Sequence, residues 1–113
     1  MPIPPNELAH ATEVLKFFCA EVPERVRHQV EHAFRVDRNA IVLISRRPRF
    51  DDPKKWESEE IAKFRFVNNR RVWVLYWPDR NSKWHEYELL EPSRRFEVLM
   101  EQVRRDPTCI FWG

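Results

Sequence analysis

The feature that most constrains this chain is an alternation of apolar and polar side chains that recurs through its middle, from Val26 to Glu88. A period of two is typical of β-strands that bury one face. It predicts strands over residues 26–36, 40–47, 61–67, 72–77 and 84–88. Most of the turns between them are short, so we expect an antiparallel β-meander. Residues 48–59 hold two prolines and many charges, and we expect an exposed loop there.

A helix on each side of the strands completes the pattern. Apolar residues recur at helical spacing over residues 6–21, where Asn6 is the expected N-cap. A second helix is expected between Pro92 and Pro107, and it turns four apolar side chains inward: Phe96, Leu99, Met100 and Val103. The prediction is an α+β fold, a five-stranded antiparallel β-meander flanked by an N-terminal and a C-terminal helix. The length of 113 residues fits one domain, 1–113.

Glycine is almost absent from the chain, and Gly113 is the only one. Turns that need a positive φ must therefore use other residue types, of which asparagine is the most tolerant. We expect these conformations at Asn39, Asn68, Asn69 and Asn81.

The length of each turn decides which side chains share a face of the sheet, because alternate residues point to opposite sides. An even turn at Asn68-Asn69 predicts a common core face for Ala62, Phe64, Phe66, Trp73, Leu75 and Trp77. An even turn in the first hairpin sends His32 and Phe34 inward as well, whereas a three-residue turn would reverse its second strand. A four-residue turn over 79–82 would add Trp84 to the core.

The opposite face then collects cations and aromatic rings over aliphatic residues: Arg46, Lys63, Arg65, Tyr76, His85 and Tyr87. Arg47 belongs to the densest basic run, in residues 46–55. Cations beside flat rings on an open sheet are what single-stranded nucleic-acid binders use to hold phosphates and bases. An ordinary solvated sheet face also carries such residues. The sequence leaves both interpretations open.

Charge is unevenly distributed although the net charge is only +2. Residues 35–83 carry 13 Lys and Arg against 7 Asp and Glu, while both flanks are acidic. The basic excess therefore lies on the strands, which favours an anionic partner. Ordinary solubility explains the same distribution.

Candidates for catalysis are few. His85 is the best acid–base candidate, but alternation sends Glu86 and Glu88 to the face opposite it. A single, terminal glycine excludes glycine-dependent phosphate loops and nucleophile elbows. We expect no catalytic residue.

Metal and thiol chemistry are not expected either. His28 and His32 lie four residues apart, but no Cys-x-x-Cys accompanies them. Cys19 and Cys109 both lie among apolar residues and are expected to be buried, inert thiols. We expect no metal and no cofactor.

The compartment is expected to be the cytoplasm. The first residues lack the basic start and apolar stretch of a signal peptide. No stretch approaches the roughly 20 apolar residues that span a bilayer, so no membrane association is expected.

Three blocks of the chain form a distinctive set: a strand ending in Arg46-Arg47-Pro48, a block from Leu75-Tyr76-Trp77 through Asp79-Arg80 to Trp84-His85 and Tyr87, and a closing Asp106-Pro107 with Phe111-Trp112-Gly113. As a set they resemble an uncharacterised bacterial family, domain of unknown function 3024. The resemblance spans about residues 25–113. It implies a small stand-alone bacterial protein and brings no activity, cofactor or catalytic residue.

These observations favour a non-catalytic binding module whose basic and aromatic sheet face engages an anionic partner, a nucleic acid or an acidic protein. One alternative is a structural protein that forms a homodimer through this face or through the Phe111-Trp112 tail. Another is an enzyme that uses His85 as acid or base, which would need a pocket at that residue.

Overall fold

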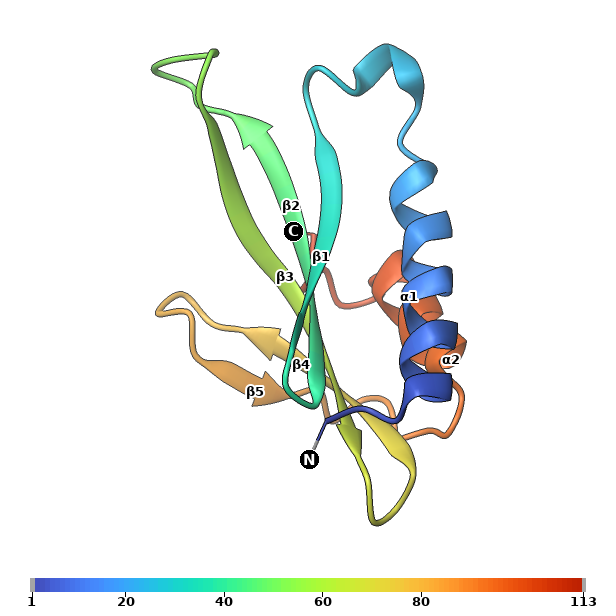
Figure 1. Ribbon diagram of the computed structural model, residues 1–113. Coiled ribbons are helices and arrows are strands. Elements are labelled where there is room, and N and C mark those ends of the chain that lie inside the picture. The colour runs from blue at the N-terminus through green and yellow to red at the C-terminus, as the bar shows by residue number, and fades with distance from the viewer. Residues whose placement is uncertain (1, 113) are drawn as a thin grey trace.

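The computed structural model describes residues 2–112 and confirms the predicted order of elements, with helices flanking five strands (Figure 1). The helices are α1 (Pro5–Ala20) and α2 (Phe96–Arg105), and a short 3-10 helix, η1 (Glu24–Val26), follows α1. The strands are β1 (Glu31–Asp37), β2 (Ala40–Pro48), β3 (Trp56–Val67), β4 (Val72–Pro78) and β5 (Trp84–Glu86).

The five strands form one antiparallel sheet in the order β1-β2-β3-β4-β5. Each strand pairs with the one before it, because short turns join antiparallel neighbours. Both α1 and α2 lie on the same side of the sheet (Figure 1). We call the face they cover the inner face and the opposite one the outer face.

The inner face buries aromatic side chains of the sheet against the helices. Phe64, Phe66 and Trp73 are almost completely buried. Phe96 of α2 packs on Phe64 and Trp73, with ring centroids 4.8 and 5.0 Å apart. Leu15 of α1 is fully buried in the same cluster. Each such side chain contributes about 1.5–3 kcal/mol of transfer free energy.

The β1–β2 and β3–β4 hairpins confirm the predicted faces. The two-residue turn after β1 places Phe34 opposite Leu43, and the four-residue turn after β3 places Phe66 opposite Trp73. Both turns are even, so the apolar sets meet on the inner face. The pairing of β2 with β3 shifts between Leu43 and Ile44, where a β-bulge interrupts the ladder.

The N-terminal boundaries differ from the prediction. Pro4 is the N-cap of α1 and Pro5 its first residue, so Asn6 is not the cap. Proline favours the first helical position, where no amide is needed. β1 begins at Glu31 instead of residue 26, because the carbonyl of Val26 accepts the amides of Gln29 and Val30 and holds a turn there.

The predicted loop over 48–59 is wrong at both ends. β2 continues to Pro48 and β3 starts at Trp56, which leaves residues 49–55 as the loop. The Arg49 amide donates to the Lys55 carbonyl across it at 2.7 Å. Past Arg46, the last partner of β1, the hairpin has no third strand. Such a ribbon buries little on either face, so its sequence lacks the alternation that reveals other strands.

Asparagines do not take the positive φ values. Within the described chain these belong to Arg38, Arg71, Ser82, Asp106 and Cys109. Each turn needs the left-handed conformation at a particular position, and the twist of the flanking strands fixes that position. The tolerance of asparagine for a positive φ is too weak to shift the left-handed conformation to a neighbouring residue.

The turn between β4 and β5 corrects a larger expectation. Pro78 pairs with Trp84, so five residues form the turn instead of four. The odd number exchanges the faces of β5. Trp84 therefore lies on the outer face, while His85 lies opposite Trp77 on the inner face.

The C-terminal tail packs on the body, as expected from its apolar sequence. Phe111 is buried against Tyr87, with ring centroids 5.2 Å apart. The Asp106 carboxylate accepts the Phe111 and Trp112 amides at 3.1 and 2.8 Å. Phe111 is thus buried within its own chain, and dimerisation through the tail stays a prediction.

No helix within residues 2–112 is long and apolar enough to cross a membrane.

Candidate binding surface

Four side chains form a cation–aromatic cluster on the outer face, which we call the central cluster: Lys63, Arg65, Tyr76 and Trp84. The Lys63 Nζ lies 5.1 Å from the Tyr76 ring centroid and 5.3 Å from that of Trp84. Arg65 Nη1 donates to the Tyr76 hydroxyl at 3.2 Å. Neither cation forms an ion pair with a carboxylate of residues 2–112. Two cations and two rings thus lie together with no carboxylate of residues 2–112 within ion-pair distance.

The strand register explains this arrangement. Lys63 lies directly opposite Tyr76 across β3 and β4, and Trp84 follows on β5 two positions from the partner of Tyr76. Beneath them, Val42 and Val74 are buried on the same face. Lys63 stands directly opposite Val42 and Arg65 directly opposite Val74, while the Lys63 amine lies over the two rings and the Arg65 guanidinium reaches the Tyr76 hydroxyl.

The remainder of the outer face is not basic, which corrects the expected basic face. Arg35 forms an ion pair with Glu60, and Arg46 forms one with Glu31 at 3.3 Å. By register, four cations on this face stand against four carboxylates: Arg35, Arg46, Lys63 and Arg65 against Glu31, Asp37, Glu60 and Glu86. With Arg35 and Arg46 paired, Lys63 and Arg65 are the two cations of this face that form no ion pair within residues 2–112, although Asp37 and Glu60 still attract the Lys63 charge at longer range.

Burial lowers the pKa of Lys63 below its ordinary value, and the Arg65 guanidinium lowers it further. Asp37 and Glu60 act in the opposite direction but do not cancel the shift. The protonated amine therefore lacks part of the stabilisation it would have in water. A bound anion would supply it.

Four predicted site residues lie away from the cluster: Arg46 is farther along the outer face, and Arg47, His85 and Tyr87 are off that face. Arg47 alternates to the face opposite Arg46. His85 lies on the inner side against Trp77, and Tyr87 is 97% buried, with its hydroxyl accepting from Gln102 Nε2 at 3.0 Å. The placement of His85 and Tyr87 on the outer face was wrong because the five-residue turn exchanges the faces of β5.

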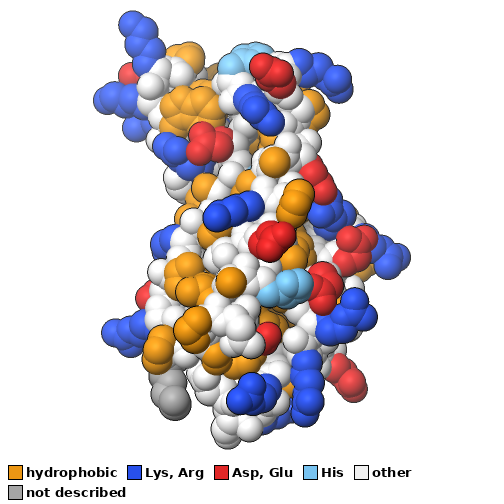
Figure 2. Space-filling view, turned by 45° about the vertical axis from the view of Figure 1, so that its right-hand side comes forward, with side chains coloured by type: hydrophobic (Ala, Val, Ile, Leu, Met, Phe, Trp, Pro, Cys, Tyr) orange, Lys and Arg blue, Asp and Glu red, His pale blue; other side chains and the backbone are white. Residues whose placement is uncertain are grey.

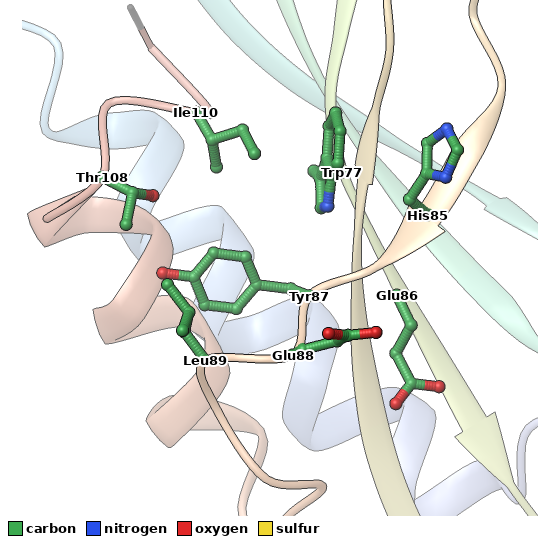
Figure 3. A pocket seen from close by; sticks show the side chains of 8 residues that line it. All are labelled: Trp77, His85, Glu86, Tyr87, Glu88, Leu89, Thr108 and Ile110. Atoms are coloured by element: carbon green, nitrogen blue, oxygen red, sulfur yellow. The ribbon is translucent and has the colours of Figure 1, made fainter.

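A pocket of about 340 Å³ opens beside His85 (Figure 3). Trp77, Tyr87 and Ile110 give it an apolar lining. His85 stacks on Trp77 at 4.8 Å, and its Nε2 lies 2.7 Å from Asp79 Oδ2. The pocket that an acid–base site would need is therefore present, and the carboxylate beside the imidazole is Asp79 instead of Glu86 or Glu88.

Asp79 organises the turn that carries this pair. Its Oδ1 accepts the amides of Asn81 and Lys83 at 2.8 and 3.0 Å, and Oδ2 contacts His85. These hydrogen bonds, with that from His85 the largest, lower the pKa of Asp79 to about 2. The carboxylate stays ionised at neutral pH and fixes the five-residue turn.

Among the remaining histidines and cysteines, His32 and Cys19 line a common pocket. His32 forms a three-ring cluster with Phe18 and Trp112, whose centroids lie 5.3 and 5.0 Å from that of His32 and 6.0 Å from each other, and burial lowers the pKa of His32. Within residues 2–112, no group of three or more His, Cys, Asp or Glu side chains is placed to hold a metal.

The two thiols differ from each other. Burial, with a smaller effect from Glu31, raises the pKa of Cys19 to about 11, so this thiol is protonated and unreactive at neutral pH. Cys109 is exposed, which corrects the expectation that it is buried.

Sequence reasoning missed Trp84 as a member of the surface. The sequence feature that could have revealed Trp84 is Asp79. An aspartate whose carboxylate accepts two backbone amides extends its turn beyond a simple four-residue loop, and the longer turn places Trp84 on the outer face. Arg46 was placed on the correct face, but it lies four residues along β2 from Val42, the partner of Lys63. At about 3.3 Å per residue that is about 13 Å from the cluster.

Comparison with known proteins identifies a family and no activity. The family model described as Domain of unknown function (DUF3024) matches residues 3–113, so it includes α1 as well as the three blocks from which the resemblance was drawn. No curated protein and no solved structure matches the chain.

Proposed function

We propose that this chain, which belongs to the DUF3024 family, is a non-catalytic binding protein that holds a single-stranded nucleic acid on the outer face of its sheet. The observation that supports the proposal is the position of the Lys63 amine between the Tyr76 and Trp84 rings, with no carboxylate of residues 2–112 in an ion pair with it. A phosphate would supply the close ion pair that Lys63 lacks there, and unpaired bases would stack beside it.

A nucleic acid fits the central cluster better than an acidic protein does. An acidic peptide would use the two cations but would leave the Tyr76 and Trp84 rings without stacking partners. Every nucleobase offers a flat face to such rings, and stacking is worth about 1–3 kcal/mol per base. The two charges and two rings of the cluster match the phosphates and bases of one short segment of single-stranded nucleic acid.

Binding of fluorescein-labelled oligothymidine, followed by fluorescence anisotropy over a series of salt concentrations, tests the proposal. Single strands lose affinity with salt at a slope of about 0.7 per neutralised phosphate. The double substitution Lys63→Gln with Arg65→Gln should therefore weaken binding and flatten the log–log slope by about 1.4. Lys16→Gln is the matched control, since Lys16 is an exposed cation of α1 on the other side of the molecule.

Two results would contradict the proposal. One is a lack of binding by the unaltered protein at low salt. The other is equal loss of affinity in the Lys16→Gln control. If polyglutamate displaces the oligonucleotide at matched charge concentration, the partner is an acidic protein instead.

A further inference from the structure

The β2–β3 hairpin extends beyond the other strands as a two-stranded arm, which we define as residues 46–58. In Figure 1 it rises to the upper left, away from α2 and β5. Its strands are paired as far as Pro48 and Trp56, and β1 accompanies it no further than Arg46. The arm contributes to the molecule's length of 46 Å, against 27 and 25 Å in the other directions. It is a ribbon open to solvent on both faces.

The loop of the arm is held by its own hydrogen bonds. The Lys55 amide donates to the Asp52 carbonyl at 2.9 Å, and the Lys54 amide to Asp52 Oδ1 at 3.2 Å. Arg49 binds Asp51 through two nitrogens, at 2.9 and 2.7 Å. These contacts give the tip a defined conformation.

Phe50 stands at this tip with its side chain completely exposed. A phenylalanine surrounded by water forgoes the favourable transfer free energy that burial would bring. No packing within the described chain uses this ring. Its exposure on a conformationally held loop points to a partner.

The charges of the arm indicate the kind of partner. Residues 46–58 hold five Lys and Arg against three Asp and Glu. Asp51 is paired with Arg49, and Asp52 caps the loop, whereas neither Lys54 nor Lys55 forms an ion pair within residues 2–112. Arg46 lies over the Trp56 ring at 5.9 Å. Figure 2 shows Lys and Arg side chains around hydrophobic ones at this upper end of the molecule.

We infer that the arm is a second nucleic-acid contact, in which Phe50 stacks on an unpaired base while Lys54 and Lys55 contact the adjoining phosphates. This inference rests on the proposed function and adds a second site to it. A membrane surface is a poorer match, because the arm offers one apolar ring at its tip, whereas interfacial binding needs a broad apolar face. A base needs only one ring to stack on.

The outer face continues from the central cluster to the base of the arm's loop. Trp56 belongs to the same side of the hairpin as Arg46 and Lys63, on the far side of the bulge. Trp56 lies seven residues before Lys63 on β3, which is about 23 Å at about 3.3 Å per residue. A single-stranded nucleic acid long enough to reach both sites binds more tightly because the sites are linked, whereas a short oligonucleotide occupies one site at a time.

The test measures the binding of oligothymidines of increasing length to Phe50→Ala and to the double substitution Lys54→Gln with Lys55→Gln. Each should weaken binding of the long oligonucleotides about tenfold, and the double substitution should also flatten the salt slope by about 1.4. Both should leave the binding of the shortest ligands to the central cluster within about twofold. Leu89→Ala is the matched control, because Leu89 is also an exposed apolar side chain, remote from the arm.

Every outcome bears on the inference. Unchanged affinity of both arm variants for all lengths overturns it and leaves the proposed function intact. Loss of affinity only in the Lys63 and Arg65 variants does the same. If Phe50→Ala abolishes binding to phosphatidylserine vesicles but not to oligonucleotides, the arm is a membrane contact and the inference is wrong. Failure of the unaltered protein to bind any length overturns both proposals together.

Discussion

The two faces of the sheet use the same kinds of aromatic residue in opposite ways. On the inner face, Trp73 packs among other rings, with Phe66 at 5.1 Å and Phe96 at 5.0 Å, and is 1% exposed. On the outer face, Trp84 has a lysine amine over its ring and remains partly open to solvent. The inner ring contributes stability through buried area, whereas the outer ring contributes a surface. The difference shows that tryptophan content alone does not locate a binding site.

The largest expected effect separates these two tryptophans. Trp73→Ala should lower the free energy of unfolding by about 3–5 kcal/mol, because it leaves a large cavity in a packed core. Trp84→Ala should lower it by about 1 kcal/mol, since only partly buried area is lost. Urea denaturation of both variants measures the difference. Equal losses would show that Trp84 is a core residue and would remove it from the central cluster.

The two tyrosines give a smaller test of the same contrast. Tyr87→Phe should destabilise the protein by about 1 kcal/mol, because Gln102 loses the hydroxyl that it donates to at 3.0 Å in a partly buried site. Tyr76→Phe should change stability by less than about 0.5 kcal/mol, since Arg65 finds water in place of the hydroxyl. Thermal unfolding of the two variants provides the comparison. The reverse order of stabilities would mean that the outer face is the more rigid one.

The sequence predicted the inner face well and the outer face only in part. The assumption of even-length turns correctly placed Phe64, Phe66 and Trp73 on one face, because the turns after β1 and β3 contain two and four residues. It failed at β5 because the Asp79 carboxylate substitutes for backbone partners and lengthens the turn. One extra residue was enough to exchange Trp84 and His85.

Ion pairing and ribbon length were beyond sequence reasoning for another reason. Arg35 and Glu60 are 25 residues apart, and they meet only because β1 and β3 both flank β2. The excess of cations in residues 35–83 therefore did not imply a basic face. The arm was predicted as a loop for two reasons. A two-stranded ribbon exposed to solvent on both faces does not require alternating apolar residues, and the prolines and charged residues of this segment are also typical of loops.

The smallest expected effect concerns Asp79, whose turn places Trp84 on the outer face and His85 on the inner face. Asp79 holds the five-residue turn, and hydrogen bonds lower its pKa from 3.8 to about 2. A lowered pKa means that its contribution to stability is complete above about pH 4 and is lost as the pH falls through about 2. The amide resonances of Asn81 and Lys83, which donate to this carboxylate, should titrate in NMR spectra with a midpoint near 2. In His85→Ala the midpoint should move toward 3.8 without reaching it, because the two backbone donors remain. A midpoint near 3.8 in the unaltered protein would mean that the carboxylate does not hold the turn, and the outward position of Trp84 would then need another cause.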